Sequence, residues 1–461
     1  MMKASLLTLF ACLISSLSWC QTDGMLFNYM GMGASTALVR DYQSIGINPA
    51  NLGYDTDYKL SFEIGSMGLS VYSEALTKEE VRYFQPTGGE QLTQEQQAAI
   101  AETLLQDGFQ TDVFVRPVAF GFDLGNAGGL AIGLSVTANQ SFTLGSEASN
   151  LLFQGFNYEG YIDTIIIEDT SNIYGVAYEP LSLAGLTEGT SLHFNLRSAA
   201  SIAWGRRWFA SDHLNIYAGI GLNYIMSYGW LDFRSQNEEI VGQAALGLDL
   251  VNSPDYIETF DPNQQPLQPV GTGFGFDIGF SADLGEDLSV GLSVVQIGKV
   301  SYDLNTLVFN NIIVDTIYFN GINSTQTLDL VSELLDGEQL LDYNGIERFE
   351  VPLPTALRAG AALKMSDMLT LAADISLPLS STAQDFSSVQ AGAGARLTLL
   401  RFLQLSGGLT AGGNYGFNVP AGIGVDLGFW EFGVSTRDIL VFLGQSKPTV
   451  SYAIGVFRFK I

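Results

Sequence analysis

The residues that most often carry enzyme chemistry are scarce in this chain. Only two histidines are present, His193 and His213, and the sequence has neither a Gly-x-Ser-x-Gly nor a His-Glu-x-x-His motif. A nucleophilic serine needs a nearby base, and a catalytic zinc ion needs clustered His or carboxylate ligands. We therefore expect both histidines to be ordinary strand or turn residues, and we do not expect an enzyme.

Carboxylates are far more abundant, and they fall into two sets. Asp255, Glu258 and Asp261 lie in a proline-rich stretch, and their spacing differs from the Asp-x-Asp-x-Asp-Gly pattern of a calcium loop. A solvated acidic loop is the expected structure, with a weak divalent-cation contact to surface lipopolysaccharide as the alternative. The second set alternates with apolar residues, which predicts a polar wall rather than a paired acid/base site: Asp277, Asp283 and Asp426.

Two glycine-rich stretches resemble phosphate loops only superficially. Residues 271–275 and 392–394 both lie inside alternating segments, and neither is followed by Lys-Ser/Thr or by a helical pattern. Strands are the expected structure at both places. No metal and no cofactor is expected.

The overall composition narrows the class of protein. The chain has 461 residues, a net charge of -28 and 47% apolar residues. It is too apolar for a disordered chain and too acidic for a nucleic-acid partner. An acidic excess also argues against an anion-selective pore. No apolar run of about 18 residues follows the N-terminal stretch, so no transmembrane helix is expected.

The first twenty residues are typical of a secretory signal peptide. Lys3 precedes a short apolar stretch, and small residues follow it, so we expect cleavage between Cys20 and Gln21. The alternative is a lipoprotein signal with Cys20 acylated, but Trp19 stands where that processing needs a small residue. Both cysteines of the chain lie in this stretch, so the exported chain would contain no disulfide and no cysteine ligand.

Most of the remaining chain alternates between apolar and small or polar residues. Stretches 214–230, 272–284 and 421–429 place apolar side chains on one face, and mostly Gly, Asn, Ser or Asp on the other. Because successive side chains of a strand point to opposite faces, this pattern predicts long strands with one apolar face. A membrane barrel and a soluble β-sandwich both have such strands.

Three features favour the barrel. Several strands run to twice the usual length of about 5–6 residues. The polar face is rich in glycine, which suits a crowded or water-lined interior. Aromatic residues gather near strand ends, where a membrane barrel has its girdles: Tyr224, Tyr228, Trp230, Phe429 and Trp430.

Short and long connections alternate between the expected strands, as in outer-membrane barrels with short periplasmic turns and long outer loops. The long connections span residues 73–111, 143–190, 232–271 and 303–350. About fourteen strands are expected, beginning near residues 59, 112, 129, 191, 213, 272, 287, 351, 368, 386, 402, 419, 430 and 449. The last tight turn is placed at Phe429–Trp430. Two further apolar segments, 238–251 and 306–320, extend barrel strands or form outer hairpins; if they span, the number changes by two, within 12–16. Helices are expected at 94–105 and 325–335.

The stretch after the signal resembles a known superfamily. Gly31-Met32-Gly33-Ala34 is followed by Asn48-Pro49-Ala50-Asn51-Leu52-Gly53 and then by the first strand. This order is similar to the start of outer-membrane long-chain fatty-acid transporters of the FadL type. It is also similar to type IX secretion proteins of the PorV type and to a related branch of unknown function. The long connection 143–190 and the expected helix at 94–105 look most like that last branch.

The resemblance implies an all-β, closed antiparallel barrel of about fourteen strands. Its N-terminal stretch would fold into the lumen. Residues 1–20 would then be the signal, 21–58 a plug or hatch shaped by Gly31, Gly33, Asn48, Pro49 and Ala50, and 59–461 the barrel. The alternative is that 21–58 is a periplasmic tail.

The C-terminal strand carries one more pattern. Phe457, Phe459 and Ile461 share one face, which resembles the signal read by the outer-membrane barrel-assembly machinery. The expected location is thus the outer membrane of a Gram-negative cell, with lipid around the barrel.

Two functions follow as expectations. The first is passive transport of hydrophobic or amphipathic small molecules past the plug. The alternative is a non-transporting scaffold, or a secretion-associated protein that binds secretion or surface proteins through the outer loops. A lumen lined continuously by apolar residues favours transport; a filled lumen with large apolar loop tips favours a scaffold.

Overall fold

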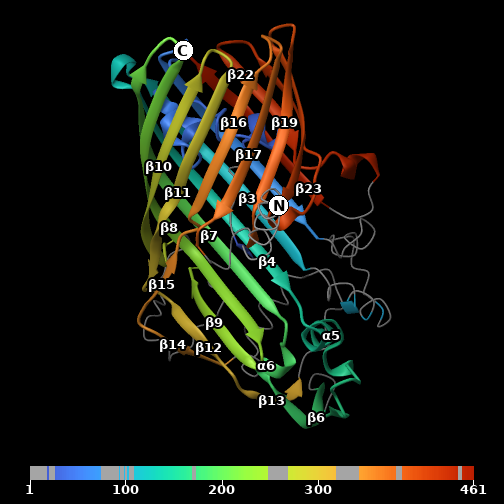
Figure 1. Cartoon of the computed structure of the whole chain (residues 1–461). Coiled ribbons are helices and arrows are strands. Elements are labelled where there is room, and N and C mark those ends of the chain that lie inside the picture. The colour runs from blue at the N-terminus through green and yellow to red at the C-terminus, as the bar shows by residue number, and fades with distance from the viewer. Residues whose placement is uncertain are drawn as a thin grey trace, which may run out of the picture.

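The computed structural model describes residues 18–19, 26–73, 93, 98, 101–102, 108–168, 173–247, 268–317, 342–380, 387–444 and 449–461. Figure 1 shows a barrel of long tilted strands, with the C-terminus and the short turns at one end and a smaller group of strands and helices at the other. Within the described residues, no helix has the length and apolar character needed to cross a bilayer.

The barrel is one closed antiparallel ladder of fourteen strands. β23 pairs back onto β2, from Ser61 opposite Lys460 to Tyr72 opposite Thr449, so the sheet has no free edge. In ring order the strands are β2 (Leu60–Tyr72), β3 (Phe109–Asp123), β4 (Gly129–Thr143), β7 (Ser191–Ala210), β8 (Leu214–Gln236), β10 (Gly271–Leu284), β11 (Leu288–Tyr302), β16 (Ala356–Lys364), β17 (Leu369–Pro378), β19 (Gln390–Leu399), β20 (Leu403–Gly412), β21 (Ala421–Asp426), β22 (Trp430–Thr436) and β23 (Thr449–Lys460). The expected fold class and strand number are confirmed.

The expected strand starts agree with the structure to within about four residues, apart from the strand expected from 351. That strand is split: β15 (Phe349–Pro352) and β16 both pair with β11, with Leu353–Thr355 between them. The last tight turn was placed wrongly. The turn spans residues 427–429. The Asp426 carboxylate accepts a hydrogen bond from the Gly428 amide at 2.9 Å, and Gly428 adopts φ +85°, so the chain reverses at Gly428.

The outer surface of the barrel is apolar, as the alternation predicts. On β10, Phe274 and Phe280 are each 54% exposed, while the intervening Gly275, Asp277 and Gly279 are buried. Exposed phenylalanines on alternate positions of a closed barrel form a lipid-facing surface. The glycine-rich stretches 271–275 and 392–394 lie within β10 and β19, as expected.

The prediction that Trp230 belongs to an aromatic girdle is wrong. Trp230 is only 5% exposed and packs against Tyr302, with 5.8 Å between ring centroids. The register of β8 against β7 shifts between Ser227 and Gly229, which leaves Tyr228 as an extra residue. A β-bulge of this kind reverses which side chains face inward, so Trp230 points into the barrel.

Beyond the loop end of the barrel, a smaller group of elements packs on the extended β7–β8 hairpin. β9 (Glu239–Leu246) pairs with β8 and with β12 (Thr306–Asn310), which pairs with β14 (Asp342–Gly345). A separate three-stranded sheet has the order β13-β6-β5. Its elements and neighbours are α5 (Ser146–Gln154), η5 (Gly155–Asn157), β5 (Thr164–Ile167), β6 (Ile173–Ser182), α6 (Leu183–Leu186) and β13 (Ile313–Ile317).

The described parts of segments 238–251 and 306–320 therefore form outer strands rather than barrel strands. Of the expected helix 94–105, residues 98, 101 and 102 are helical and the rest lies outside the described residues. The expected helix 325–335, the acidic loop with Asp255, Glu258 and Asp261, and the cleavage site at Cys20 and Gln21 also lie outside them.

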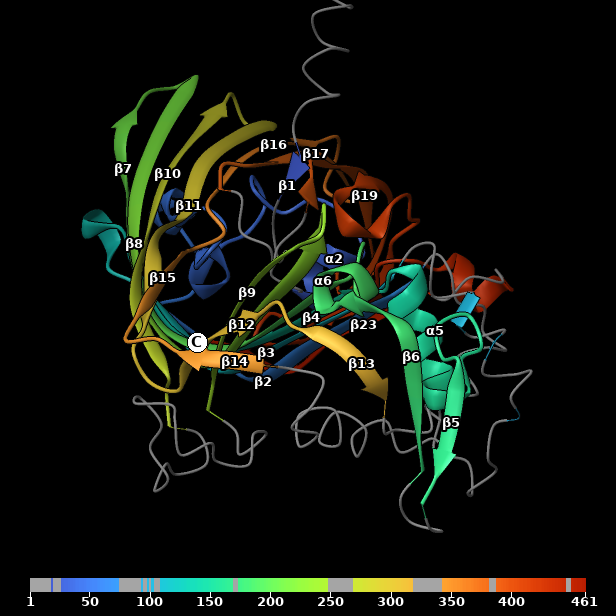
Figure 2. The same ribbon diagram turned by 90° about the horizontal axis from the view of Figure 1, so that it is seen from below.

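The N-terminal segment, residues 26–53, lies inside the ring of strands. Figure 2 looks along the barrel and shows this segment in blue within the ring. It contains α2 (Phe27–Met30), η1 (Asp41–Ser44) and η2 (Pro49–Gly53), and every residue of these three elements is buried. The barrel core is therefore formed by this segment and the inward faces of the strands. Short elements complete the chain: β1 (Ser18–Trp19), which pairs with β18 (Ser387–Ser388), η4 (Gly125–Ala127), η6 (Gly413–Tyr415) and η7 (Leu440–Leu443).

Candidate functional site in the barrel lumen

The Asn-Pro-Ala motif docks the N-terminal segment on the wall. Asn48 caps η2, because its side chain accepts a hydrogen bond from the Ala50 amide at 3.2 Å, and Pro49 occupies the first helical position. The Asn48 amide group donates to Ser281 Oγ of β10 at 2.9 Å. The same hydroxyl donates to Asn51 Oδ1 at 2.6 Å. One short helical turn is thus capped and fixed to the barrel by the same asparagine.

The wall opposite this turn is made of glycine because the segment approaches very closely. A Cβ atom on Gly279 would overlap Asn48 Oδ1, and one on Gly219 would overlap the Pro49 carbonyl. A Cβ atom on Gly205 would also overlap Pro49. The glycine face of these strands therefore faces a crowded interior at this level.

Gly31 and Gly33 make similar approaches on the opposite side of the lumen. A Cβ atom on Gly31 would lie 2.7 Å from Ser406 Oγ, and one on Gly33 would lie 2.6 Å from Thr410 Cγ2. Gly33 also adopts φ +70°, which disfavours any side chain. All five predicted motif residues thus lie at the interface between the segment and the wall.

Asp374 of β17 binds two consecutive backbone amides of the segment. Its Oδ2 atom accepts hydrogen bonds from the Ser35 amide at 2.6 Å and from the Thr36 amide at 2.7 Å. Arg358 of β16 donates to Ser35 Oγ at 3.3 Å. A carboxylate that accepts two main-chain donors is a strong anchor, because hydrogen bonds to a charged group are stronger than neutral ones.

A buried ionic cluster holds the segment at a third point. Arg458 of β23 lies 2.9 Å from Asp41 Oδ2 and also pairs with Glu431. Lys460 lies 2.9 Å from the same Glu431 carboxylate. Asp41 carries a positive φ of +50° and also accepts from Tyr58 Oη at 2.7 Å. Breaking one partner of such a buried pair leaves an uncompensated charge, which costs about 3–5 kcal/mol.

Two tyrosines that follow the segment, Tyr54 and Tyr58, lie partly buried next to carboxylates. Burial raises the pKa of Tyr54 to about 12, with Asp283 adding to the shift and Arg40 opposing it. Tyr54 Oη donates to Asp283 Oδ1 at 3.1 Å. Burial also raises the pKa of Tyr58, and Asp41 adds to that shift. Both phenols are therefore protonated donors at neutral pH.

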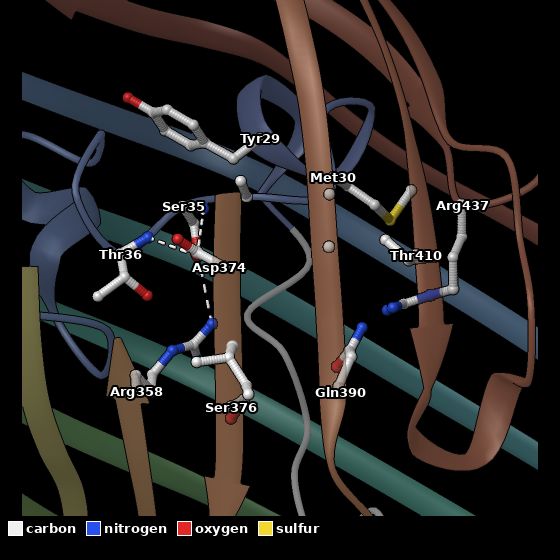
Figure 3. A pocket seen from close by; sticks show the side chains of 14 residues that line it. Tyr29, Met30, Ser35, Thr36, Arg358, Asp374, Ser376, Gln390, Thr410 and Arg437 are labelled. Carbon is white, nitrogen blue, oxygen red and sulfur yellow. Dashed lines mark hydrogen bonds between the residues drawn. The ribbon is translucent and has the colours of Figure 1, made fainter. Parts of the chain in front are cut away.

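A polar pocket opens between the segment and strands β16, β17, β19 and β20 (Figure 3). It has about 550 Å³ of empty volume, open solvent at its mouth included. Its lining residues are Tyr29, Met30, Gly33, Ala34, Ser35, Thr36, Arg358, Asp374, Ile375, Ser376, Gln390, Gly392, Thr410 and Arg437.

Several of these lining residues, Thr410 and Arg437 among them, retain polar atoms with no hydrogen-bond partner among the described residues. Arg437 is only 4% exposed and its Nε is unpaired, although its guanidinium stacks on Tyr415 at 4.3 Å. Thr410 Oγ1 is unpaired as well. In Figure 3 the Arg437 and Gln390 side chains point toward one another across the pocket. The pocket has two guanidinium groups and one carboxylate, so its local charge is opposite in sign to the net charge of the chain.

The remaining chemical residues have separate structural partners. His193 Nδ1 lies 2.9 Å from Asp232 Oδ1, and Asp232 also binds Arg234. His213 lies in the turn before β8, where its carbonyl accepts from the Gly285 amide at 2.9 Å. In the described part of the chain, no three His, Cys, Asp or Glu side chains form a group that would hold a metal ion.

The three inward carboxylates are not brought together as one site. Their partners are distinct: Asp277 binds Asn223 and the Gln296 amide, Asp283 binds Tyr54, Tyr217 and Ser289, and Asp426 binds Lys460. They brace the wall and its contact with the segment, as expected of a polar wall.

The C-terminal pattern is placed on the outside of the barrel. Phe457 is 53% exposed and Ile461 70% exposed, and Phe459 stacks on Phe62 of the first barrel strand at 5.1 Å. These side chains flank the seam where β23 meets β2 and closes the ladder.

Four site residues were not predicted from the sequence: Arg358, Asp374, Arg437 and Arg458. A usable signal was present, because the chain has only 20 Lys and Arg residues and two of these three arginines, Arg358 and Arg458, fall inside alternating strands. A cation at a small-residue position of a lipid-facing strand must point into the lumen.

Three comparisons with known proteins gave a family match and a set of similar structures. Residues 212–436 match the model of a family of unknown function, DUF5723. No curated protein matches the chain. Solved structures that resemble it include a TodX monoaromatic hydrocarbon channel with a deltaS2S3 mutation, at 13% identity and a TM-score of 0.46, covering 94% of this chain and 97% of that one.

Two further structures are similar. The P. putida toluene transporter TodX has 10% identity and a TM-score of 0.40, covering 96% of this chain and 99% of that chain. A Pseudomonas aeruginosa FadL homologue has 8% identity and a TM-score of 0.43, with the same coverages. At these identities and scores the barrel assignment depends on the closed strand ladder itself, and no substrate is carried over.

Proposed function

We propose that this protein is an outer-membrane channel that admits hydrophobic or amphipathic small molecules passively, with residues 26–53 as its closing plug. In this proposal the chain is exported with cleavage of its signal peptide, and the barrel-assembly machinery inserts it through the C-terminal strand. The proposal assigns the Gly31–Gly33 and Asn48–Ala50 motifs to docking of the plug.

The main support for this proposal is that two residues both line the polar pocket and bind the N-terminal segment. Asp374 and Arg358 line the pocket, and both also bind Ser35 or Thr36 of the segment. A ligand that binds these side chains competes with the contacts that hold the segment. Occupation of the pocket would therefore weaken docking of residues 31–38, which is what a ligand-opened channel needs.

The pocket chemistry favours an amphipathic molecule with a small anionic head. Arg437 has unused donor capacity, and Arg358 supplies a second guanidinium. Met30 and Tyr29 supply an apolar contact for a short tail. An acidic exterior would slow the approach of such an anion without preventing its binding.

Proteoliposome swelling tests the transport proposal. Hexanesulfonate serves as the amphipathic anion, because its head stays ionised and it crosses lipid slowly, and arabinose serves as a polar solute of similar size. We expect swelling with hexanesulfonate to exceed that with arabinose, and Arg437→Gln to remove most of this preference. Deletion of residues 31–53 should raise the flux of both solutes.

The matched control is Asp112→Asn. Asp112 is a buried wall carboxylate that binds Asn139 at 2.6 Å and Tyr415, and within the described part of the chain it forms no hydrogen bond with residues 26–53. It should leave both fluxes unchanged. Unchanged flux after the deletion, in a barrel that still shows heat-modifiable migration, would sink the transport proposal.

A second candidate function is an outer-membrane anchor for secretion or surface proteins. One observation favours it: the lumen is filled at the level of the segment, while apolar side chains of the outer sheet are exposed, among them Ile167 and Tyr178. Cross-linking in intact cells tests this role, and capture of nothing beyond assembly factors would count against it.

A further inference from the structure

The strands β5 and β6 form a hairpin that extends away from the barrel on the loop side. Figure 2 shows the two strands running outward past the ring. They pair from Thr164 opposite Val176 to Ile167 opposite Ile173. β5 is the last strand of the sheet β13-β6-β5, so its other edge has no strand partner among the described residues.

The hairpin is firmly held at its base. Tyr161, Ile162, Ala177 and Leu183 belong to one buried cluster with residues of α5 and β13. Asp163 accepts a hydrogen bond from the Tyr178 amide at 2.7 Å. The edge is therefore presented by an ordered element with its own hydrophobic core.

Both faces of β5 expose apolar side chains. Ile165 and Ile167 are 46% and 69% exposed on one face, and Ile166 is 36% exposed on the other. Tyr178 on β6 is 69% exposed. An open strand edge with exposed isoleucines is a template for pairing with another extended chain.

The stretch of chain that contains this edge is acidic. Residues 143–190 contain seven Asp and Glu and no Lys, Arg or His. Asp163 and Glu168 directly flank the four residues of β5. This charge favours a cationic partner and opposes a second copy of the same edge, and it also opposes the anionic surface of the outer leaflet.

We propose that β5 is a docking edge for an extended segment of another exported protein, one that adds as a fourth strand and carries Lys or Arg beside alternating apolar residues. Main-chain hydrogen bonds would supply the pairing, Ile165 and Ile167 would contact the apolar positions, and the flanking acids would select positive charge. This inference specifies the anchoring role and is independent of flux through the barrel.

Peptide binding to the purified full-length protein in detergent micelles tests the proposal. The probe is a fluorescein-labelled octapeptide that alternates Thr with Val or Ile and carries Lys at both ends. Two control peptides share its sequence, one with Glu at both ends and one with alternate backbone amides methylated. We expect saturable binding of the Lys peptide, at least tenfold weaker binding of the Glu peptide, and loss of binding on amide methylation.

Ile167→Ser should weaken binding of the Lys peptide at least fivefold. Ile313→Ser is the matched control, because Ile313 is 63% exposed on β13, the opposite edge of the same sheet, and should leave binding unchanged. Equal effects of both substitutions, tolerance of amide methylation, or no saturable binding would overturn the proposal. A change of oligomeric state on Ile167→Ser would instead assign the edge to self-association and would also overturn it.

Discussion

Replacing Asp374 by Ala should loosen the N-terminal segment selectively. The substitution removes the acceptor for the Ser35 and Thr36 amides, at 2.6 and 2.7 Å. A hydrogen bond to a charged group contributes about 1.5–3 kcal/mol, and two such bonds are lost. Water entering the pocket replaces about half of this, so we expect docking to weaken by about 1.5–3 kcal/mol.

The chain offers a direct assay, because its only cysteines are Cys12 and Cys20. With both replaced by Ala, Ala37→Cys introduces one thiol at a segment position that is 1% exposed. Its labelling by a water-soluble maleimide then reports the undocked fraction. Since about 1.4 kcal/mol corresponds to a factor of ten, labelling should accelerate roughly 10- to 140-fold in the Asp374→Ala protein.

Two variants separate docking from general damage to the barrel. Asp374→Asn keeps an acceptor oxygen but loses the charge, so its acceleration should be smaller. Asp112→Asn removes a wall carboxylate without touching the segment and should leave labelling at the starting rate. Labelling that stays slow in Asp374→Ala, or that rises equally in Asp112→Asn, would refute the anchoring role.

Three further outcomes are expected. Gly279→Ala should undock the segment, because the new Cβ overlaps Asn48 Oδ1, whereas Gly407→Ala has 3.8 Å to its nearest neighbour and should be neutral; thiol labelling of the segment distinguishes the two. Raising the pH from 10 to 12 should weaken docking of the segment. The pKa of Tyr54 is about 12 in the docked state, whereas an exposed phenol ionises near 10, so the undocked state loses its proton first. Tyr54→Phe should flatten this pH dependence of the labelling rate. Removing residues 459–461 should reduce the yield of heat-modifiable barrel in cells while the precursor level stays the same, and an unchanged yield would contradict the assembly signal at Phe459.

The barrel itself was accessible from sequence because two simple constraints act on every strand. Lipid requires apolar side chains on one face, and strand geometry places them at every second position, as with Phe274, Phe276 and Phe280. The alternation is therefore long and regular enough to locate most strands within a few residues. Closure follows because an open edge is not tolerated in the hydrocarbon layer.

The positions of β-bulges, which interrupt this alternation, could not be predicted from the sequence. One extra residue at Tyr228 moves Trp230 from the lipid face to the interior, and the amino-acid types on either side fit both faces. A similar break occurs on β3, where the register against β4 shifts between Val115 and Val118. A bulge is set by packing against neighbouring strands, and that packing is non-local.

The lumen shows a second reason why the sequence pattern did not predict the whole site. Glycine on the inward face fits a water-lined pore and a crowded core equally well, since both avoid bulky side chains. Only the overlap of a Cβ atom on Gly219 or Gly279 with Asn48 and Pro49 distinguishes them, and that overlap joins positions more than 150 residues apart. The same holds for Asp374, whose partners at Ser35 and Thr36 lie 338 or 339 positions away. The inward glycines and the Asn-Pro-Ala motif therefore depend on each other: enlarging either surface separates the segment from the wall, so the two should be exchanged together when the plug of one such barrel is moved into another.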